Sequence, residues 1–316
     1  MTRYISQRLV ESVIVLFVMS FIIYALIGLM PGDPVDVMIN ANPHATAQDA
    51  ARLRALYGLD RPIGERYLDW LGAALQGDLG YSRLHARPVL EVLLPRLGNT
   101  VALMGISFVL AIALAMPCGI LAAVRPRTVT DTSINLFAFA GISVPPFWLA
   151  ILLIILFSVL LGWLPAGGMP PTGAGPGAQA AYLALPVATL TIVTVGGIVR
   201  FVRAAMIEAL RQDYVRTAWA KGLSERQVVL GHVLRNAMIP VVTILALNFG
   251  ALFSGALITE TMFGYLGMGK TIYDAILGND FNLALVGLLL ATATTLLANL
   301  AADLCYTWLD PRITYT

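Results

Sequence analysis

Six long apolar stretches constrain the fold more than any other feature of the sequence. They lie near Leu9 to Met30, Thr100 to Val124, Ile134 to Leu161, Leu183 to Val202, Ile239 to Ile258 and Leu283 to Ala302. A helix of about 20 apolar residues crosses the hydrocarbon core of a bilayer and satisfies its own backbone hydrogen bonds there. The composition agrees, because only 12% of the residues are charged, against about 25% in soluble domains. The sequence therefore predicts an all-α, polytopic membrane protein with six transmembrane helices.

The first apolar stretch has the position of a secretory signal but not its pattern. The apolar region of a signal is about 7–15 residues long and ends at small residues, whereas this stretch is longer and runs into Pro31-Gly32-Asp33-Pro34. We therefore expect it to remain as a transmembrane helix. Glu11 lies one turn after Arg8, and an i,i+3 ion pair near the helix end would accommodate its charge.

The distribution of basic residues predicts the orientation, because Lys and Arg concentrate in cytosolic loops. Arg3 and Arg8 precede the first stretch, and segment 200–235 holds seven basic residues against three acidic ones, whereas segment 162–182 holds no charge. Both termini are therefore expected in the cytosol. The chain then divides into the N-terminus with the first helix (1–30), an external loop with a small helical lid (31–98), and a core (99–316) whose cytosolic loop spans 203–238.

The external loop carries signals for two short helices. Thr46 and Asp49 have the spacing of a capping box at the start of the first, and Gly58 and Pro62 are expected to close it. The second is expected to end at Gly77 and to have four apolar residues on one face. These are Tyr67, Leu68, Leu71 and Leu75. A lid packed on the outer membrane face is the favoured interpretation, and a docking surface for a soluble partner is the alternative.

Two glycine-rich segments lie outside the apolar stretches. Segment 162–177 combines Gly and Pro without a charge, which predicts a flexible loop with no chemistry. Gly264 to Thr271 matches the phosphate-binding pattern G-x-x-x-x-G-K-[ST]. That pattern has physical meaning only between a strand and a helix, and here it follows an apolar helix on the expected external side, where ATP is absent. We therefore interpret it as a tight external turn.

The long cytosolic loop has the most informative pattern. The residues from Asp213 favour a helix that ends at Gly222, where a positive φ is expected. Ser224 is expected to cap a second helix, with Gln227 in the reciprocal position. That helix has an apolar face ahead of Pro240, made of Val229, Leu230, Val233 and Leu234. The pattern predicts two short helices, joined by a glycine, that stand out of the membrane.

Two interpretations of this loop follow from its residues. Its basic side chains suit contact with lipid headgroups. Its apolar residues Tyr214, Trp219 and Leu223 suit an anchor that fills a groove on a protein partner, because aromatic residues near an Arg dominate such contacts. Partner docking is the favoured interpretation.

Small and polar residues occur within the last three apolar stretches. They are Thr189, Thr191, Thr194, Gly196, Gly197, Thr243, Asn248, Gly250, Ser254, Gly255 and Asn299. Close helix packing is the expected role of most of them. Asn248 is the exception, because a mid-span amide is costly without a partner or water. Asn248, Ser254 and Glu260 are the candidates for a pathway or gate. For Glu260, a docking charge and a simply solvated external charge are the alternatives.

The sequence from Asp213 to Thr243 (DYVRTAWAKGLSERQVVLGHVLRNAMIPVVT) resembles the cytoplasmic coupling loop of permease subunits of ATP-binding-cassette importers, in the dipeptide, oligopeptide and nickel branch. Further segments resemble that branch, in order, along nearly the whole chain. They are Pro31 to Pro34, Gly77 to Ser82 (GDLGYS), Ser143 to Phe147 (SVPPF), Trp163 to Pro165, Glu260 to Phe263, Asp303 and Asp310 to Arg312. Gly264 to Thr271 resembles a glycine-rich external segment of these permeases with no nucleotide role. Trp219 departs from the branch, whose members commonly have a basic residue there.

The resemblance implies a multi-pass permease subunit of the bacterial inner membrane. The residues it assigns to ATPase coupling are Asp213, Tyr214, Arg216, Thr217, Ala218, Trp219, Ala220, Lys221, Gly222, Leu223, Ser224 and Glu225. The implied partners are a homologous second permease, two cytosolic ATPases, an extracytoplasmic substrate-binding protein and the lipid bilayer, with no nucleic acid. The chain is expected to have no catalytic residue and to bind no cofactor or metal, because the ATPases use ATP and Mg. The implied solute is a di- or oligopeptide, with nickel chelates or another small solute as alternatives.

Two other functions remain as rivals. A stand-alone secondary transporter or channel would be favoured by mid-depth carboxylates and by inverted repeats with broken helices. Here Glu11 and Asp303 lie near the expected cytosolic ends, and Pro145-Pro146 interrupts only one span. A stand-alone membrane ATPase rests on Gly264 to Thr271 alone.

Overall fold

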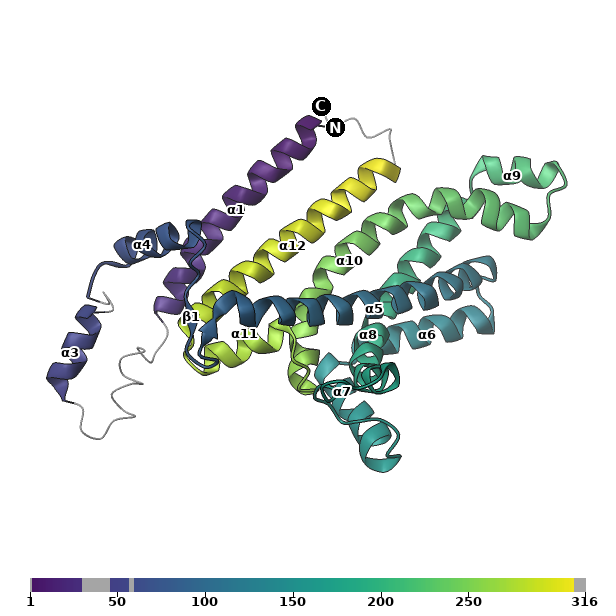
Figure 1. Cartoon of the computed structure of the whole chain (residues 1–316). Helices are drawn as coiled ribbons and strands as arrows, with labels where there is room; N and C mark the ends of the chain where they lie inside the picture. Colours follow the sequence, from purple (N-terminus) through teal and green to yellow (C-terminus); the bar gives the residue numbers. More distant parts are fainter. Residues whose placement is uncertain (1, 30–45, 57–59, 310–316) are drawn as a thin grey trace. The chain divides into compact units, whose positions relative to one another are not determined.

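The computed structural model describes residues 2–29, 46–56 and 60–309, almost all of them in helices (Figure 1). Pro31 to Pro34 and Asp310 to Arg312 lie outside these residues. Five of the described helices are long and apolar enough to cross a membrane, and a bent pair of helices makes a sixth span if it is counted as one. The predicted all-α membrane architecture is therefore confirmed, with five spans, or the predicted six when the bent pair is counted as one.

The described residues fall into two compact units. The first unit comprises residues up to Asn99 and Gly267–Leu296. Its elements are α1 (Thr2–Gly28), α3 (Ala47–Leu56), α4 (Ile63–Leu75), the antiparallel strands β1 (Tyr81–Ser82) and β2 (Arg87–Pro88), the start of α5 (Val89–Val124), α11 (Met268–Leu277) and the first half of α12 (Phe281–Leu309).

The second unit comprises Thr100–Leu266 and the residues from Leu297 onward. It contains the rest of α5 and α12. Its other elements are α6 (Val129–Ser143), α7 (Pro146–Leu153), the π-helix η1 (Ile154–Leu160), α8 (Pro176–Leu210), α9 (Asp213–Ala220), the π-helix η2 (Gln227–Val233) and α10 (Leu234–Met262).

The helices α5 and α8 extend well beyond the apolar stretches that predict them. They are 36 and 35 residues long, which corresponds to roughly 50 Å at 1.5 Å per residue. A bilayer core is only about 30 Å thick. The ends of both helices therefore reach beyond the hydrocarbon region, and the C-terminal end of α8 leads directly into α9.

The third predicted span is broken at its prolines. The helix α6 ends at Ser143, and α7 begins at Pro146 after a bend of 102°. Pro145 has φ −61° and ψ 136°, because a residue that precedes a proline is excluded from the helical region. The expected interruption at Pro145-Pro146 is therefore confirmed.

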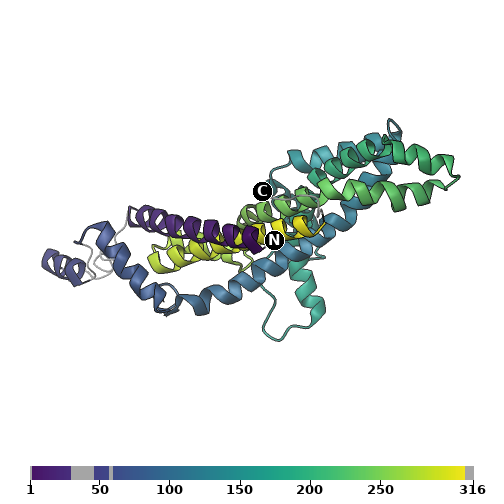
Figure 2. The same cartoon turned by 90° about the horizontal axis from the view of Figure 1, so that it is seen from above.

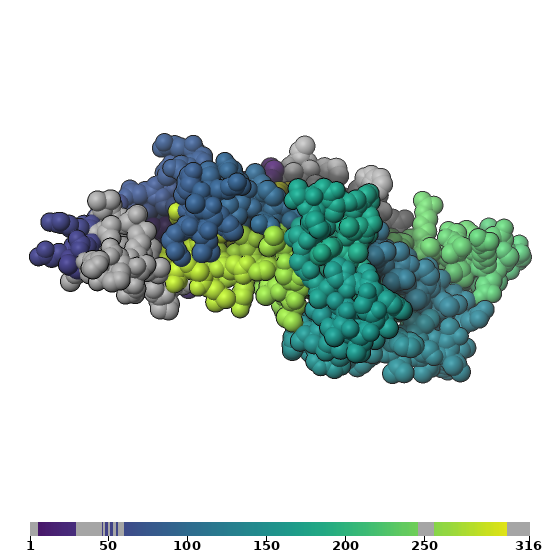
Figure 3. All heavy atoms as spheres, turned by 60° about the horizontal axis from the view of Figure 1, so that its bottom comes forward, coloured from purple at the N-terminus to yellow at the C-terminus, as the bar shows by residue number. Residues whose placement is uncertain are grey.

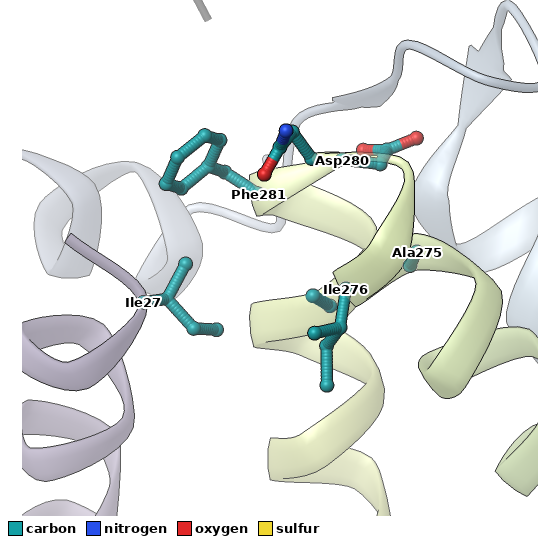
Figure 4. Close-up of a pocket in the computed structure, with 7 residues that line it drawn as sticks. Ile27, Ala275, Ile276, Asp280 and Phe281 are labelled. Atoms are coloured by element: carbon teal, nitrogen blue, oxygen red, sulfur yellow. The ribbon is translucent and has the colours of Figure 1, made fainter. Parts of the chain in front are cut away.

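In the first unit, Asp280 joins the β-hairpin to the junction of α11 and α12. Its buried carboxylate accepts hydrogen bonds from the Ser82 hydroxyl at 2.6 Å and the Leu84 amide at 2.9 Å, and its other oxygen caps α12 at the Leu283 amide. Beside this junction is a gap of about 140 Å³ that has no room for a water molecule. Figure 4 shows Ile27, Ile276 and Phe281 around it, so the gap is a packing defect between apolar side chains.

The helix α4 packs on α1 through Tyr67, and only part of the face that the sequence predicts is buried. Tyr67 is buried among the rings of Phe17, Phe21 and Tyr24, and its hydroxyl lies 2.7 Å from the Ser20 hydroxyl. Leu68 and Leu75, expected on the same face, are exposed. The predicted face is therefore confirmed for Tyr67 and for the half-buried Leu71 and wrong for Leu68 and Leu75, because the aromatic cluster with α1 sets the rotation of α4.

The signals for the short helix α3 and the N-terminal ion pair are confirmed. The Thr46 amide and hydroxyl both donate to the Asp49 carboxylate, and the Asp49 amide donates back to the Thr46 hydroxyl. The Thr46 hydroxyl holds the pKa of the Asp49 carboxyl below its usual range. Arg8 and Glu11 form the expected i,i+3 ion pair at 3.2 Å.

In the second unit, α8 packs against both α6 and α10 (Figure 2). A Cβ atom added at Gly196 of α8 would lie well inside 3.0 Å of the Ala138 carbonyl oxygen of α6, and one at Gly141 of α6 would lie 2.8 Å from the Ile192 carbonyl oxygen of α8. The two backbones are therefore nearly in contact, as expected for small residues in a membrane. The packing role predicted for Gly196 is confirmed.

The loop at 162–177 is anchored at its centre, although the sequence predicts a flexible loop. The Gly168 amide donates to the Phe263 carbonyl at the end of α10 at 2.7 Å. A Cβ at Gly167 would collide with the same carbonyl. The glycines here permit close approach of two backbones, and a glycine-rich sequence gives the same signal for that as for flexibility.

Candidate coupling surface

The candidate site is built on α9, a two-turn helix at the end of the second unit. Val215 and Ala218 form its buried face and pack in one cluster with residues of α8, η2 and α10. Trp219 is 45% exposed and Tyr214 is 36% exposed. Figure 1 shows α9 lying over η2, and in Figure 3 the light-green segment around them projects at the right edge. The helix is thus held rigidly by its Val215 and Ala218 face, and Tyr214 and Trp219, about 140° apart around the helix axis, are exposed at the two edges of that face.

The turn at Gly222 fixes how α9 ends. Gly222 has φ +77°, its amide donates to the Trp219 carbonyl at 2.9 Å, and the Leu223 amide donates to the Ala218 carbonyl at 3.4 Å. These two bonds form the Schellman motif, which satisfies the last carbonyls of a helix and needs a left-handed residue. The predicted positive φ and the predicted end of the helix are confirmed.

The start of the second helix is confirmed, and so is its apolar face at Val229, Val233 and the half-buried Leu234, but not at Leu230, and its predicted end is wrong. The Gln227 side chain accepts hydrogen bonds from the Ser224 amide at 3.0 Å and from the Ser224 hydroxyl at 2.8 Å. Leu230 is exposed, and Val228 is buried in its place. The physical reason is that η2 is a π-helix, whose i→i+5 hydrogen bonds rotate later residues away from α-helical positions.

The second helix also runs on through Pro240, which lies inside α10. The expectation of a short helix that ends ahead of this proline is therefore wrong. A proline is accommodated within a membrane helix because neighbouring helices and local adjustments satisfy the freed backbone groups. The coupling segment is thus continuous with a membrane-crossing element.

An open depression lies next to α9 on η2. It has a volume of about 470 Å³ and is lined by Leu223, Arg226, Gln227, Leu230, Gly231 and His232. Arg216, Lys221 and Arg226 are exposed around α9 and this depression, together with Asp213, Thr217, Ala220, Ser224 and Glu225. Of the twelve predicted coupling residues, Ala218 is buried and Leu223 is half-buried. The exposed ten combine two aromatic side chains with charged ones, which is the composition of a protein-docking site.

The structure adds one buried pair that the sequence analysis misses. Arg203 of α8 donates two parallel bonds to the carboxylate of Asp131 in α6, from Nε at 2.7 Å and from Nη2 at 2.8 Å. The Arg127 amide and the Asn135 side chain donate to the same carboxylate at 2.9 Å and 2.6 Å. In the sequence, Arg203 is one of many basic residues and has no distinguishing pattern. Asp131 follows Thr128 by three residues, which is the spacing of a helix cap, and this spacing is the signal that could have drawn attention to Asp131.

The predicted pathway and gate residues are only partly covered by the structure. The side chains of Asn248 and Ser254, with those of the other residues from 246 to 255, lie outside the described residues. Glu260 is completely buried and accepts a hydrogen bond from the Thr100 hydroxyl of α5. The alternative of a solvated charge is therefore wrong for Glu260, because it bridges two long helices.

The segment Gly264 to Thr271 has the wrong context for a phosphate site. It follows the helix α10 rather than a strand, and Gly264 makes the turn with φ +60°. Lys270 donates to Asp274 at 2.5 Å, and the buried Thr271 hydroxyl donates to the Gly267 carbonyl at 2.7 Å. Both side chains therefore serve α11 itself. Among the residues that the structure describes, no group of three or more His, Cys, Asp or Glu side chains converges as a metal site requires.

Comparisons with known proteins cover the whole chain. Residues 115–315 match the family model of the binding-protein-dependent transport system inner membrane component, and residues 1–104 match the model of its N-terminal region. A putative peptide permease protein of Brucella ovis is 40% identical over the full length of both chains. The oligopeptide transport system permease protein AppB of Bacillus subtilis is 35% identical, and the glutathione transport system permease protein GsiC of Escherichia coli is 37% identical, again over both full lengths.

Solved structures with the same fold are more distant in sequence. An inward-facing form of the MetNI methionine transporter matches with a TM-score of 0.59 at 20% identity, over 71% of this chain and 98% of that chain. An amino acid ABC transporter matches with a TM-score of 0.52 at 12% identity, over 76% of this chain and 98% of that chain. These likenesses concern the fold.

Proposed function

The chain belongs to the family of inner-membrane components of binding-protein-dependent transport systems, and from this premise we propose that it forms half of the translocation pathway of a peptide importer. The family implies a multi-pass inner-membrane protein that works with ATPase subunits and a substrate-binding protein. Under the proposal, a homologous second permease supplies the other half of the pathway, and two cytosolic ATPases bind the coupling loops of the two permeases, with α9 as the docking helix of this chain. The chain itself carries out no bond chemistry and binds no cofactor or metal, since ATP and Mg belong to the ATPases.

One observation carries the proposal for α9: a short helix held by its Val215 and Ala218 face exposes Tyr214 and Trp219 at the two edges of that face. Exposed aromatic groups on a soluble surface are unfavourable, and a rigid helix that presents them loses little entropy when a partner covers them. The flanking Arg216 and Lys221 add charge around the two aromatic side chains. The proposal therefore assigns the coupling role to the twelve residues named above between Asp213 and Glu225, with Trp219 as the docking anchor and Ala218 holding α9 in place from its buried face.

Solute class and orientation belong to the same proposal. Relatives named for peptides, oligopeptides and glutathione, at 35–40% identity over the full chain, support di- or oligopeptides as the solute, ahead of nickel chelates. The basic residues between 200 and 235 support a cytosolic α9 and cytosolic termini, which puts segment 31–98 outside.

Asn248 and Ser254 remain the proposed pathway residues, and Glu260, buried between α5 and α10, is proposed to hold the outer gate closed rather than to dock a partner.

The test replaces Trp219 in the complete transporter. Trp219→Ala should weaken ATPase binding by about 2 kcal/mol or more, roughly thirtyfold in affinity, because a buried aromatic anchor is lost. The measurement is ATPase affinity for the detergent-solubilised permease pair. Trp148→Ala is the matched control, because Trp148 is 48% exposed in α7 and lies outside the coupling segment. Unchanged ATPase affinity for Trp219→Ala would contradict the docking role of α9.

The rival functions predict different behaviour of the isolated chain. A stand-alone transporter or channel would move solute by itself, and a stand-alone ATPase would hydrolyse ATP. We expect neither activity from the purified chain in proteoliposomes, and both activities when the partner subunits are added. Solute flux through the chain alone would favour the channel instead.

A further inference from the structure

The carboxylate of Asp131 is buried and accepts hydrogen bonds on both of its oxygens. Its side chain is 6% exposed and that of Arg203 is 28% exposed. Four donors surround the two carboxylate oxygens: Arg203 Nε and Nη2, the Arg127 amide and Asn135 Nδ2. Such an ion pair is costly to desolvate, and its two parallel hydrogen bonds form only in one relative orientation of the side chains. It therefore fixes the position of α8 relative to α6 more than it adds stability.

The pair lies at one end of a seam between two antiparallel helices. Along the seam, Gly141 of α6 meets Ile192 of α8, Ala138 meets Gly196, and Asp131 meets Arg203. The residue number falls along α6 as it rises along α8. The near contact at Gly196 and the ion pair at Arg203 are seven residues apart, about 10 Å along the helix. The seam is thus held by backbone contact in its middle and by the ion pair at the end nearest α9.

The segment beyond Arg203 transmits position to α9. Only residues 211 and 212 separate the end of α8 from the start of α9. Met206 and Ala209 of α8 pack in one buried cluster with Val215 and Ala218 of α9 and with Val228 of η2. A tightly packed cluster of this kind moves as a block rather than deforming continuously. Whatever fixes α8 at Arg203 therefore fixes the orientation of α9.

We propose that Asp131 and Arg203 are positioning residues that couple α9 to the membrane helices, so that motion imposed on α9 by an ATPase moves α6 and α8 together. This inference rests on the proposed docking role of α9. Without the pair, α8 can rotate against α6 at its α9 end, and motion of α9 is then absorbed locally. ATP is hydrolysed in that case without a matching movement of solute.

The test uses the complete transporter in proteoliposomes and measures solute taken up per ATP hydrolysed. The double variant Asp131→Asn/Arg203→Met removes the ion pair and leaves no unpaired buried charge. We expect the ATPases to bind it normally and uptake per ATP to fall about tenfold, because the bonds lost are charge-assisted. Uptake per ATP equal to that of the parent would overturn the proposal.

Two further variants keep the result decisive. Arg203→Lys retains the charge but not the two parallel hydrogen bonds, so it should also lower uptake per ATP. This variant becomes the deciding test if the double variant fails to assemble. An assembled Arg203→Lys transporter with the parent's uptake per ATP would then refute the proposal. Arg200→Met is the matched control, because Arg200 lies over the Phe139 ring of α6 at 5.5 Å, one turn away on α8. An equal fall in uptake per ATP for Arg200→Met would also refute the proposal, since the loss of any contact on the seam would then have the same effect as the loss of the ion pair.

The outcome is separable from that of the docking proposal. If Trp219→Ala weakens ATPase binding while the Arg203 variants leave uptake per ATP unchanged, only the positioning role fails. If Trp219→Ala leaves ATPase binding unchanged, the docking role fails first.

Discussion

Two adjacent glycines of α8 provide a sharp test of the seam between α6 and α8. Gly196 and Gly197 both lie inside the helix, where replacement of Gly by Ala favours folding by about 1 kcal/mol on propensity alone. A Cβ at Gly197 meets no described atom within 4 Å, whereas a Cβ at Gly196 meets the Ala138 carbonyl well inside 3.0 Å. The two substitutions are chemically identical and differ only in what the new methyl group touches.

The magnitude follows from the size of the clash. To restore an ordinary contact of at least 3.4 Å, α6 and α8 have to separate by roughly 1 Å, and overpacking of this kind costs about 1–3 kcal/mol. Because a main-chain carbonyl cannot rotate away, we take the upper end, which leaves Gly196→Ala destabilised by about 2 kcal/mol after the gain in propensity. Gly197→Ala should be neutral or stabilised by up to about 1 kcal/mol. Gly141→Ala, with its contact at 2.8 Å, should fall between them.

The assay is thermal unfolding of the purified chain in detergent. For a difference of about 2–3 kcal/mol and about 2–4 °C per kcal/mol, Gly196→Ala should melt roughly 4–12 °C below Gly197→Ala. The ranking of the three variants matters more than any single value. Melting temperatures of Gly196→Ala and Gly197→Ala that agree within about 1 °C would refute the close approach of the two helices.

Two further predictions concern α9 and the orientation of the chain. Gly222→Val should insert and assemble but lose uptake, because a β-branched residue is strongly disfavoured at φ +77°. Gly222→Asn should retain uptake, because Asn tolerates the left-handed region. Similar uptake by the two variants would contradict the left-handed turn at Gly222. In a cysteine-free background, Leu277→Cys should react with an impermeant thiol reagent in intact cells, and Ser224→Cys should react only after the membrane is opened, because the basic residues predict a cytosolic α9. The reverse labelling pattern would invert the proposed orientation.

The sequence by itself determined the class of fold and several local structures. Long apolar stretches must form helices in a bilayer, since lipid satisfies no backbone group, so the six spans follow from composition and length. Thr46 with Asp49, Ser224 with Gln227, and Gly222 mark helix ends by chemistry that acts within a few residues. For the same reason the turn after α9 was predictable.

Only the tertiary structure decided which faces of these helices are buried. The rotation of α4 depends on the aromatic residues of α1, and the exposure of Leu230 depends on the π-helical path of η2. Neither the rotation of α4 nor the exposure of Leu230 has a signal in the local sequence, because apolar residues occur in a membrane protein both where a helix faces lipid and where it faces protein. The two uses of glycine at Gly167 and Gly222, close approach and left-handed turn, are likewise indistinguishable until the neighbouring backbone is placed.

The pairing of Asp131 with Arg203 shows this division most clearly. The spacing of Thr128 and Asp131 predicts a helix cap, and a cap is indeed present, with the Asp131 amide 3.3 Å from the Thr128 hydroxyl. The bond to Arg203 joins residues 72 positions apart, and its formation depends on the antiparallel register of α6 and α8, set by Gly141 and Gly196. Local chemistry fixed where each helix begins and ends, and long-range packing fixed which charges meet, because contact between distant residues depends on the placement of whole helices.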